Sequence, residues 1–231
     1  MNYLQLCQSL RAEAGLSGSG PASVVGQSGM YGKLVDWVQE AYAEILDMHP
    51  WAFLWTRATP VLTIGQTVYT GADFDPAITD LGRVFASQML DISSASRPRI
   101  LWCEWSALDR RSTDGAQGPP RYFTRRPDDA LVFYPVPDDD YEIQIDYQRA
   151  APALAANDDL PLIPDAKLHK IIVYKALEYY GQHNEDMGAA QHGARQFAVL
   201  LSRMADLYTP AMRIEPAPLD QPQPPSIAEL V

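Results

Sequence analysis

The residues best suited to hold a metal ion lie near the end of the chain, where His183, Glu185, Asp186 and His192 occur close together. Imidazole and carboxylate groups are common ligands of zinc and other transition metals. A helix presents two histidines to one ion when they are spaced i and i+4. His183 and His192 are nine residues apart across Gly188, so one helix face cannot present both. We therefore predict no metal here and interpret the segment as a solvated bend between helices.

Two other candidate sites lack the pattern that their chemistry needs. Asp138–Asp140 offers carboxylates, but a calcium loop alternates its oxygen ligands and contains a glycine at its sharp turn. This acidic run is more typical of a hairpin turn. Cys103 lies between Trp102 and Glu104 with no obvious activating base, which favours an inert buried thiol over a nucleophile. The chain has two cysteines, Cys7 and Cys103. Two are too few for a disulfide framework or a four-cysteine zinc site.

Common catalytic and nucleotide-binding motifs are absent from the sequence. It has no GxxxxGK[ST], no GxSxG, no HExxH, and no GxGxxG after a predicted strand. We therefore expect no catalytic residue, no metal and no cofactor. A small hydrolase of unrecognised type is an alternative that requires a polar pocket with a nucleophile and a base close together, and the sequence offers no candidate pair.

Arginines are unusually dense in one part of this acidic chain. They could form a patch for nucleic acid or for a partner protein, because arginine is enriched at protein interfaces. They could instead pair with the aspartates at positions 128, 129 and 138–140, which neighbouring hairpins would bring close, and this second interpretation is favoured. The arginines are Arg110, Arg111, Arg121, Arg125 and Arg126. Of these, the candidate interface residues are Arg110, Arg111, Arg125 and Arg126.

The charge and composition of the chain limit its partners. Its 231 residues carry a formal net charge of −11 and are 47% hydrophobic, within the range of globular proteins. Binding a phosphate backbone over a broad surface needs clustered lysine and arginine, so the acidic balance predicts a surface that repels nucleic acid. No basic leader precedes an apolar run, and no stretch approaches the roughly 20 apolar residues of a membrane span. We expect a protein made in the cytoplasm, with no membrane partner.

Apolar residues at three- and four-residue steps predict helices at both ends of the chain. The predicted helices cover about residues 3–14, 28–48, 165–181 and 189–208. Gly15 and His49-Pro50 end the first two, and Gly181 and Gly188 mark where the third bends or breaks before the fourth. Four apolar stripes would bury one another most simply as a four-helix bundle.

Between these helices the apolar period changes to two, which predicts β-strands. Residues 59–70 predict a hairpin around Gly65-Gln66, and residues 83–92 and 99–105 predict further strands. Residues 141–148 alternate between apolar and polar, which indicates a sheet with one dry face, whereas residues 130–134 are apolar throughout. The predicted fold is therefore α+β. Residues 1–58 and 153–208 form a helical bundle, and residues 59–152 form an inserted antiparallel β sandwich or barrel.

The final segment, residues 209–231, forms a proline-rich arm with apolar residues spaced along it. Prolines at positions 210, 216, 218, 222, 224 and 225 forbid a helix and favour an extended, polyproline-like backbone. A solvated spacer does not need apolar groups, so we predict that the arm becomes ordered against another molecule. A disordered terminus is the alternative. The candidate contact residues are Met212, Ile214, Leu219, Ile227, Leu230 and Val231.

Three stretches together resemble the phage head-to-tail adaptor proteins, the connector or gatekeeper ring proteins that include those called tail tubular protein A. The order of parts is also similar: helices, β insertion, helices and an extended C-terminal arm. The substantial β insertion departs from the leanest members, which leaves open what the insertion contacts. The three stretches are LCQSLRAEAGLSGSGPASVVGQSGMYGKLVDWVQEAY (6–42), PPRYFTRRPDDALVFYPVPDDDYEIQIDYQR (119–149) and LPLIPDAKLHKIIVYKALEYYG (160–181).

The resemblance implies a structural virion protein in the neck between head and tail, not an enzyme. It would form a ring of twelve copies below the portal and would surround the DNA without sequence-specific binding. Its arm would run into clefts of the portal protein, and its β module would face outward or toward downstream tail or nozzle proteins. The alternative is another tail structural protein, or a carbohydrate- or receptor-binding virion protein that uses Trp102 and Trp105. That alternative predicts exposed aromatic residues, whereas the adaptor interpretation predicts mostly buried ones.

Overall fold

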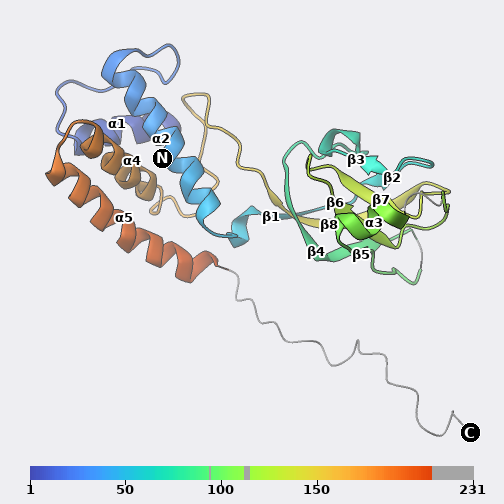
Figure 1. Ribbon diagram of the computed structural model, residues 1–231. Coiled ribbons are helices and arrows are strands. Elements are labelled where there is room, and N and C mark those ends of the chain that lie inside the picture. Colours follow the sequence, from blue (N-terminus) through green and yellow to red (C-terminus); the bar gives the residue numbers. More distant parts are fainter. Residues whose placement is uncertain (94, 112–114, 210–231) are drawn as a thin grey trace, which may run out of the picture.

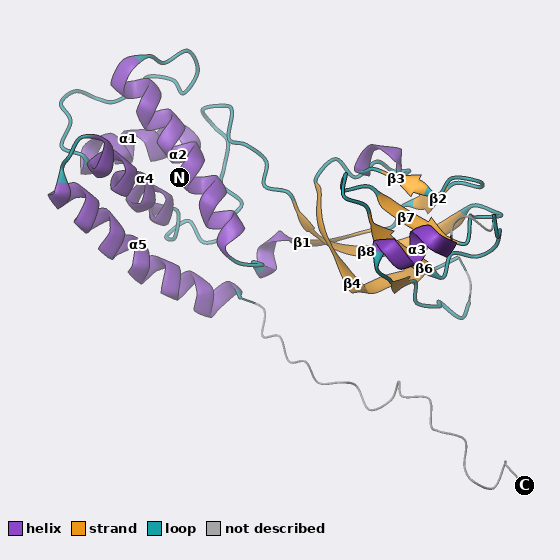
Figure 2. Ribbon diagram, in the orientation of Figure 1, coloured by secondary structure: helices purple, strands orange, loops and turns teal. Residues whose placement is uncertain are grey.

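The computed structural model describes residues 1–93, 95–111 and 115–209, and describes residues 85–88, 110 and 111 by their backbone alone. Helices from both ends of the chain form one body, and strands from the middle of the chain form a second body beside it (Figure 1). Figure 2 shows this separation, with the long helices at left and the strands at right. The predicted α+β class is confirmed.

The first two helices begin and end where local chemistry requires. Helix α1 (Tyr3–Glu13) starts with a capping box, in which the Asn2 side chain accepts from the Gln5 backbone N–H at 2.9 Å and the Gln5 side chain accepts from the Asn2 backbone N–H at 3.0 Å. Gly15 follows with φ +66°, a left-handed conformation that favours glycine and ends the helix as predicted. Helix α2 (Gly29–Met48) begins directly after Ser28 and ends before His49-Pro50.

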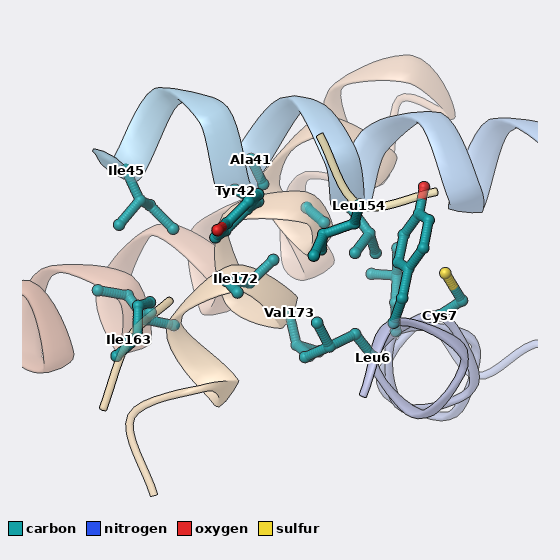
Figure 3. Close-up of a cluster of buried hydrophobic side chains, with 14 of the residues drawn as sticks. Leu6, Cys7, Ala41, Tyr42, Ile45, Leu154, Ile163, Ile172 and Val173 are labelled. Atoms are coloured by element: carbon teal, nitrogen blue, oxygen red, sulfur yellow. The ribbon is translucent and has the colours of Figure 1, made fainter. Parts of the chain in front are cut away.

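The helical core is built around α4 (Lys170–His183). Ile171, Ile172 and Val173 are consecutive and all buried, because α4 packs against α1, α2 and α5 (Met187–Tyr208). Consecutive buried apolar residues point to different sides of a helix, which is typical of a helix with neighbours on several sides. Figure 3 shows side chains from α1, α2, α4 and the loop before α4 meeting in this core. The labelled members are Leu6, Cys7, Ala41, Tyr42, Ile45, Leu154, Ile163, Ile172 and Val173.

Two details of the C-terminal helices differ from the prediction. The third helix was expected to start after Pro164, but α4 begins at Lys170. The Asp165 side chain accepts from the Lys167 backbone N–H at 2.8 Å, a local bond that competes with helix formation. Gly181 does not break the helix. It lies inside α4 and packs against the backbone of Ala190 in α5, while the break falls at residues 184–186.

The strands in the described residues form two sheets that enclose a second core. In the first sheet, the long strand β8 pairs with β1 and β2 along one edge and with β4 along the other. The second sheet has the order β3-β7-β6-β5. All pairs are antiparallel except β5 with β6, which is parallel. The strands are β1 (Trp55–Ala58), β2 (Val61–Leu62), β3 (Val68–Tyr69), β4 (Leu81–Asp91), β5 (Leu101–Trp102), β6 (Tyr122–Arg125), β7 (Leu131–Tyr134) and β8 (Tyr141–Arg149).

Strand β8 organises this module as its alternating pattern predicts. Ile143 and Ile145 are fully buried at 0% exposure, while the residues between them lie on the wetter face. β1 and β2 follow the same register along β8. They are separated at Thr59-Pro60, where proline has no N–H to donate to a ladder. Strand β7 is buried on both faces, as predicted for residues 130–134.

One prediction within the module is wrong and another is confirmed only in part. The predicted hairpin around Gly65-Gln66 does not form, because β2 pairs with β8 and β3 pairs with β7 in the other sheet. Leu62 and Tyr69 are both fully buried in the core between the sheets, so the chain turns a corner between the two layers. The predicted strand 99–105 is short, since β5 ends at Trp102 and helix α3 (Trp105–Arg111) begins three residues later.

Candidate assembly surfaces

The side chains considered as metal ligands are distributed over α4, α5 and the turn between them. His183 accepts a hydrogen bond from Lys33 Nζ at 2.5 Å, and its ring lies 5.3 Å from the Trp37 ring. His192 contacts a tyrosine ring of α4, and Asp186 caps the N-terminus of α5. In the described part of the chain, no three His, Cys, Asp or Glu side chains come together as a metal site.

The acidic run and the cysteine also have local structural partners. Asp138 accepts from the Tyr141 hydroxyl at 2.6 Å, and Asp140 accepts from the Ile64 backbone N–H at 3.0 Å. These carboxylates therefore hold the turn before β8 in shape. Cys103 is half-buried rather than buried, and its Sγ donates to the Phe123 carbonyl at 3.7 Å.

Two of the candidate arginines pair with the aspartates of the next turn, as the favoured interpretation predicted. Arg125 Nε lies 2.9 Å from Asp129 Oδ1, and Arg126 Nη2 lies 3.0 Å from Asp128 Oδ2. The Arg126 guanidinium also lies 5.8 Å from the centre of the Trp105 ring. The side chains of Arg110 and Arg111 lie outside the described residues. An interface role for these four arginines stays a prediction.

A polar cluster that the sequence analysis did not identify joins three helices. We call Glu44, Lys175, Glu178 and Tyr179 the Lys175 cluster. Lys175 Nζ lies 3.1 Å from Glu44 Oε1 and 3.3 Å from Glu178 Oε2, and it lies 5.3 Å from the centre of the Phe197 ring in α5. The Tyr179 hydroxyl donates to Glu44. Burial alone would raise the pKa of Glu44, but the bonds from Tyr179 and Lys175 lower it below its ordinary value.

Helix α2 carries an acidic stripe on its outer face. Asp36, Glu40 and Asp47 are exposed, and Glu44 of the Lys175 cluster lies between them. Steps of three and four residues place all four carboxylates on one side of the helix. The spacing is visible in the sequence and is the signal that could have identified this surface.

The edge of the second sheet exposes apolar side chains beside a groove. Leu101 is 52% exposed and Trp102 is 45% exposed, whereas Trp105 is half-buried. The exposure of Trp102 is what the receptor-binding alternative predicts, whereas the adaptor interpretation predicts mostly buried aromatic residues. The groove has a volume of about 500 Å³, and we call it the β5 groove. Its lining includes Pro98, Pro119, Pro120, Arg121, Tyr122 and Tyr141.

A larger cleft of about 610 Å³ lies between the end of α2 and strands β4 and β8. Its lining contains His49 and Arg149 but no serine, threonine or cysteine in the part of the chain that the structure describes. The hydrolase alternative needs a nucleophile beside a base. Asp47 also lines the cleft, so among the described residues the lining offers a carboxylate near an imidazole but no hydroxyl or thiol nucleophile.

The arm residues chosen as contacts, Met212, Ile214, Leu219, Ile227, Leu230 and Val231, lie outside the described residues. Among the residues that are described, no helix is both long and apolar enough to cross a membrane.

Comparison with known families gives one result that covers most of the chain. The family model described as SU10 adaptor protein matches residues 1–219. The match spans both helical ends, the β module and the first part of the arm. No curated protein matches the chain. The resemblance to phage adaptors inferred from three sequence stretches is confirmed, and the family supports a structural rather than an enzymatic role. The chain belongs to the SU10 adaptor protein family and is a structural component of the phage virion at the head–tail junction.

Proposed function

We propose that this protein forms a ring below the portal that links the capsid vertex to the tail and surrounds the DNA channel. The family match across residues 1–219 is the observation that carries this proposal. The number of copies proposed is twelve, from the resemblance to the connector proteins.

The helical body supports side-by-side packing in such a ring. Helices α2 and α5 lie on different sides of the central helix α4 (Figure 1). The outer side of α5 exposes Val199 at 62% and Leu207 at 56%. When a neighbouring subunit covers apolar groups that a monomer leaves in water, the contact is stabilised by about 25 cal/mol for each Å² of apolar surface buried. The outer face of α5 is therefore the proposed contact with the next copy.

The charge of the chain supports a role around DNA. The acidic stripe on α2 would be repeated once per subunit, and the net charge of −11 adds to its field. Repulsion of phosphate by a channel wall keeps DNA from adhering to it. The acidic stripe is therefore the proposed lining of the channel.

The arm is the proposed contact with the portal. Its prolines restrict φ in the free state, so less entropy is lost when the arm becomes ordered. A buried Leu or Ile side chain contributes roughly 1.5–3 kcal/mol, which is weak for one arm after ordering is subtracted. A ring that presents many arms at once binds far more tightly through effective concentration.

Deleting Thr209–Val231 tests this role. The truncated chain is expected to keep the helical circular dichroism of the full chain but to lose binding to portal rings and the ability to join filled heads. Replacing Ile214, Leu219, Ile227 and Leu230 by serine should have the same effect, because it removes the apolar contacts and keeps the prolines. Replacing Gln221 and Gln223 by serine is the matched control and should bind normally. Undiminished portal binding by the truncated chain would refute the role of the arm.

Exposure of Trp102 supports a second candidate, in which the β module binds a carbohydrate or receptor. Aromatic rings on an exposed edge are suited to such contacts. Titration with host-surface glycans should then quench tryptophan fluorescence in the full chain, and Trp102→Ala should abolish that quenching. The absence of any glycan effect would remove this candidate.

A further inference from the structure

The β5 groove has the chemistry of a site for proline-rich chains. Two tyrosines, Tyr122 and Tyr141, and two exposed prolines, Pro98 and Pro119, line it together with the buried Pro120. The polar residues of the lining are Asp91, Ser96, Arg99 and Arg121. Grooves lined by aromatic side chains bind polyproline II segments, which pack successive prolines between the rings. Leu101 lines the same groove, and it is exposed together with its neighbour Trp102. The groove therefore offers an apolar surface that the described chain leaves in contact with solvent.

The chain itself contains a segment that fits this groove. We propose that residues 219–225 of the arm, with the sequence LDQPQPP, bind in the β5 groove of the same chain. Pro222 and Pro225 have the PxxP spacing that suits polyproline recognition. Leu219 supplies an apolar group next to them. Asp220 supplies a negative charge, and Arg121 is an exposed cation in the groove lining.

The distance from the body to the groove matches this segment of the arm. Helix α5 ends at Tyr208, whose ring lies 5.4 Å from the Phe53 ring just before β1. Trp55 in β1 is opposite Gln148 in β8, and Tyr141 of the groove lies seven residues farther along β8, about 23 Å at the rise of a strand. Adding the step from Tyr208 to β1 gives a span of roughly 35 Å, which a polyproline chain covers in about eleven residues. The arm is therefore long enough to reach the groove from about Leu219 onward.

Binding of this segment would hold one of the arm's apolar contacts, Leu219, and its last three prolines away from solvent before assembly. The consequence for assembly rests on the proposed function. A portal cleft would have to displace the arm from the groove before it could bind it. Docking would therefore be favoured on a portal ring, where many clefts bind many arms at once. Binding to the groove itself is independent of the portal and can be measured without it.

The test is a cross-link within the full chain at low protein concentration. Gln221→Cys places one thiol in the segment, Pro119→Cys places the second at the groove, and Cys103→Ser removes the half-buried native thiol. The matched control replaces Pro119→Cys by Ile64→Cys. Ile64 is 59% exposed and its backbone N–H donates to Asp140, beside the same end of β8. Ile64 follows β2, which pairs with one edge of β8. The groove lies toward the other edge of β8, where β4 pairs and contributes Asp91 to the lining.

With a short bismaleimide, the groove pair should form the intramolecular cross-link at least about tenfold faster than the Ile64 pair, because a bound segment has a higher local concentration than a free tether. Arg121→Glu should slow the groove cross-link, Asp220→Arg should slow it similarly, and combining the two should restore it. Equal rates for the two pairs would overturn the proposal. So would a cross-link that forms mainly between two chains, which would assign the groove to the arm of another copy. Failure of the arm to bind portal would leave this result unchanged.

Discussion

Replacing Gly181 by alanine tests the close packing of α4 on α5. A Cβ added at Gly181 would lie 2.4 Å from the backbone nitrogen of Ala190 and 2.7 Å from its Cα. Both atoms belong to the backbone of α5, so no side chain can rotate away to make room. The two helices would have to separate locally, near the start of α5.

The expected magnitude follows from two opposing effects. Inserting a methyl group into a tightly packed contact costs about 1–3 kcal/mol, and a distance this short indicates the upper end of that range. Replacing glycine by alanine within a helix gains up to about 1 kcal/mol. The net destabilisation is therefore about 2 kcal/mol, which corresponds to a fall in Tm of roughly 4–8 °C for a chain of this size.

Urea and thermal unfolding followed by far-ultraviolet circular dichroism would measure this change. Gly188→Ala is the matched control in α5, because a Cβ there meets only the Asp186 side-chain oxygen, at 3.3 Å. Because the same oxygen caps α5 by accepting from the Ala189 backbone N–H, Gly188→Ala should destabilise by at most about 1 kcal/mol, less than Gly181→Ala. If Gly181→Ala unfolded at the same urea concentration as the unmodified chain, the close approach of α4 and α5 would be refuted.

Three further predictions concern charge, modularity and DNA. The folded pKa of Glu44 lies below its ordinary 4.5, so its stabilising contribution is present above that pH and lost as the pH falls through the folded pKa. Glu44→Gln should therefore reduce the acid dependence of unfolding, and an unchanged dependence would count against the Lys175 cluster. Excising residues 55–152 with a short linker should leave a soluble helical protein, since the bundle and the β module have separate cores; loss of all helical signal would contradict this. The isolated protein should not bind duplex DNA at moderate salt, and tight, salt-sensitive binding would contradict the proposed channel lining.

The sequence predicts those elements of the fold that bury one face. Helices α1 and α2 and strand β8 each show a clear apolar period, and their bounds follow from local signals such as Gly15 and Pro50. Pairing is different, because a period of two does not specify the partner strand. Residues 61–69 therefore suggested a hairpin although their two strands belong to facing sheets. Strand β6 was not predicted, since its four residues mix buried and exposed positions without alternation.

The candidate surfaces show the same limit. The pairs of Arg125 and Arg126 could be predicted because their aspartates follow within four residues. The Lys175 cluster could not, because Tyr179 and Glu44 are 135 residues apart. The β5 groove collects residues from three separate stretches of the chain, within 91–101, within 119–122 and at Tyr141. Such surfaces depend on the tertiary fold, which local patterns do not specify.

The central claim is that this protein forms a ring on the portal, and a mass measurement tests it most directly. Native mass spectrometry of the purified full chain, alone and mixed with portal rings, would give the number of copies bound. The proposal predicts a defined complex with one ring of twelve copies for each portal ring. A chain that stays unbound in the mixture, or that binds in a variable number of copies, would contradict it.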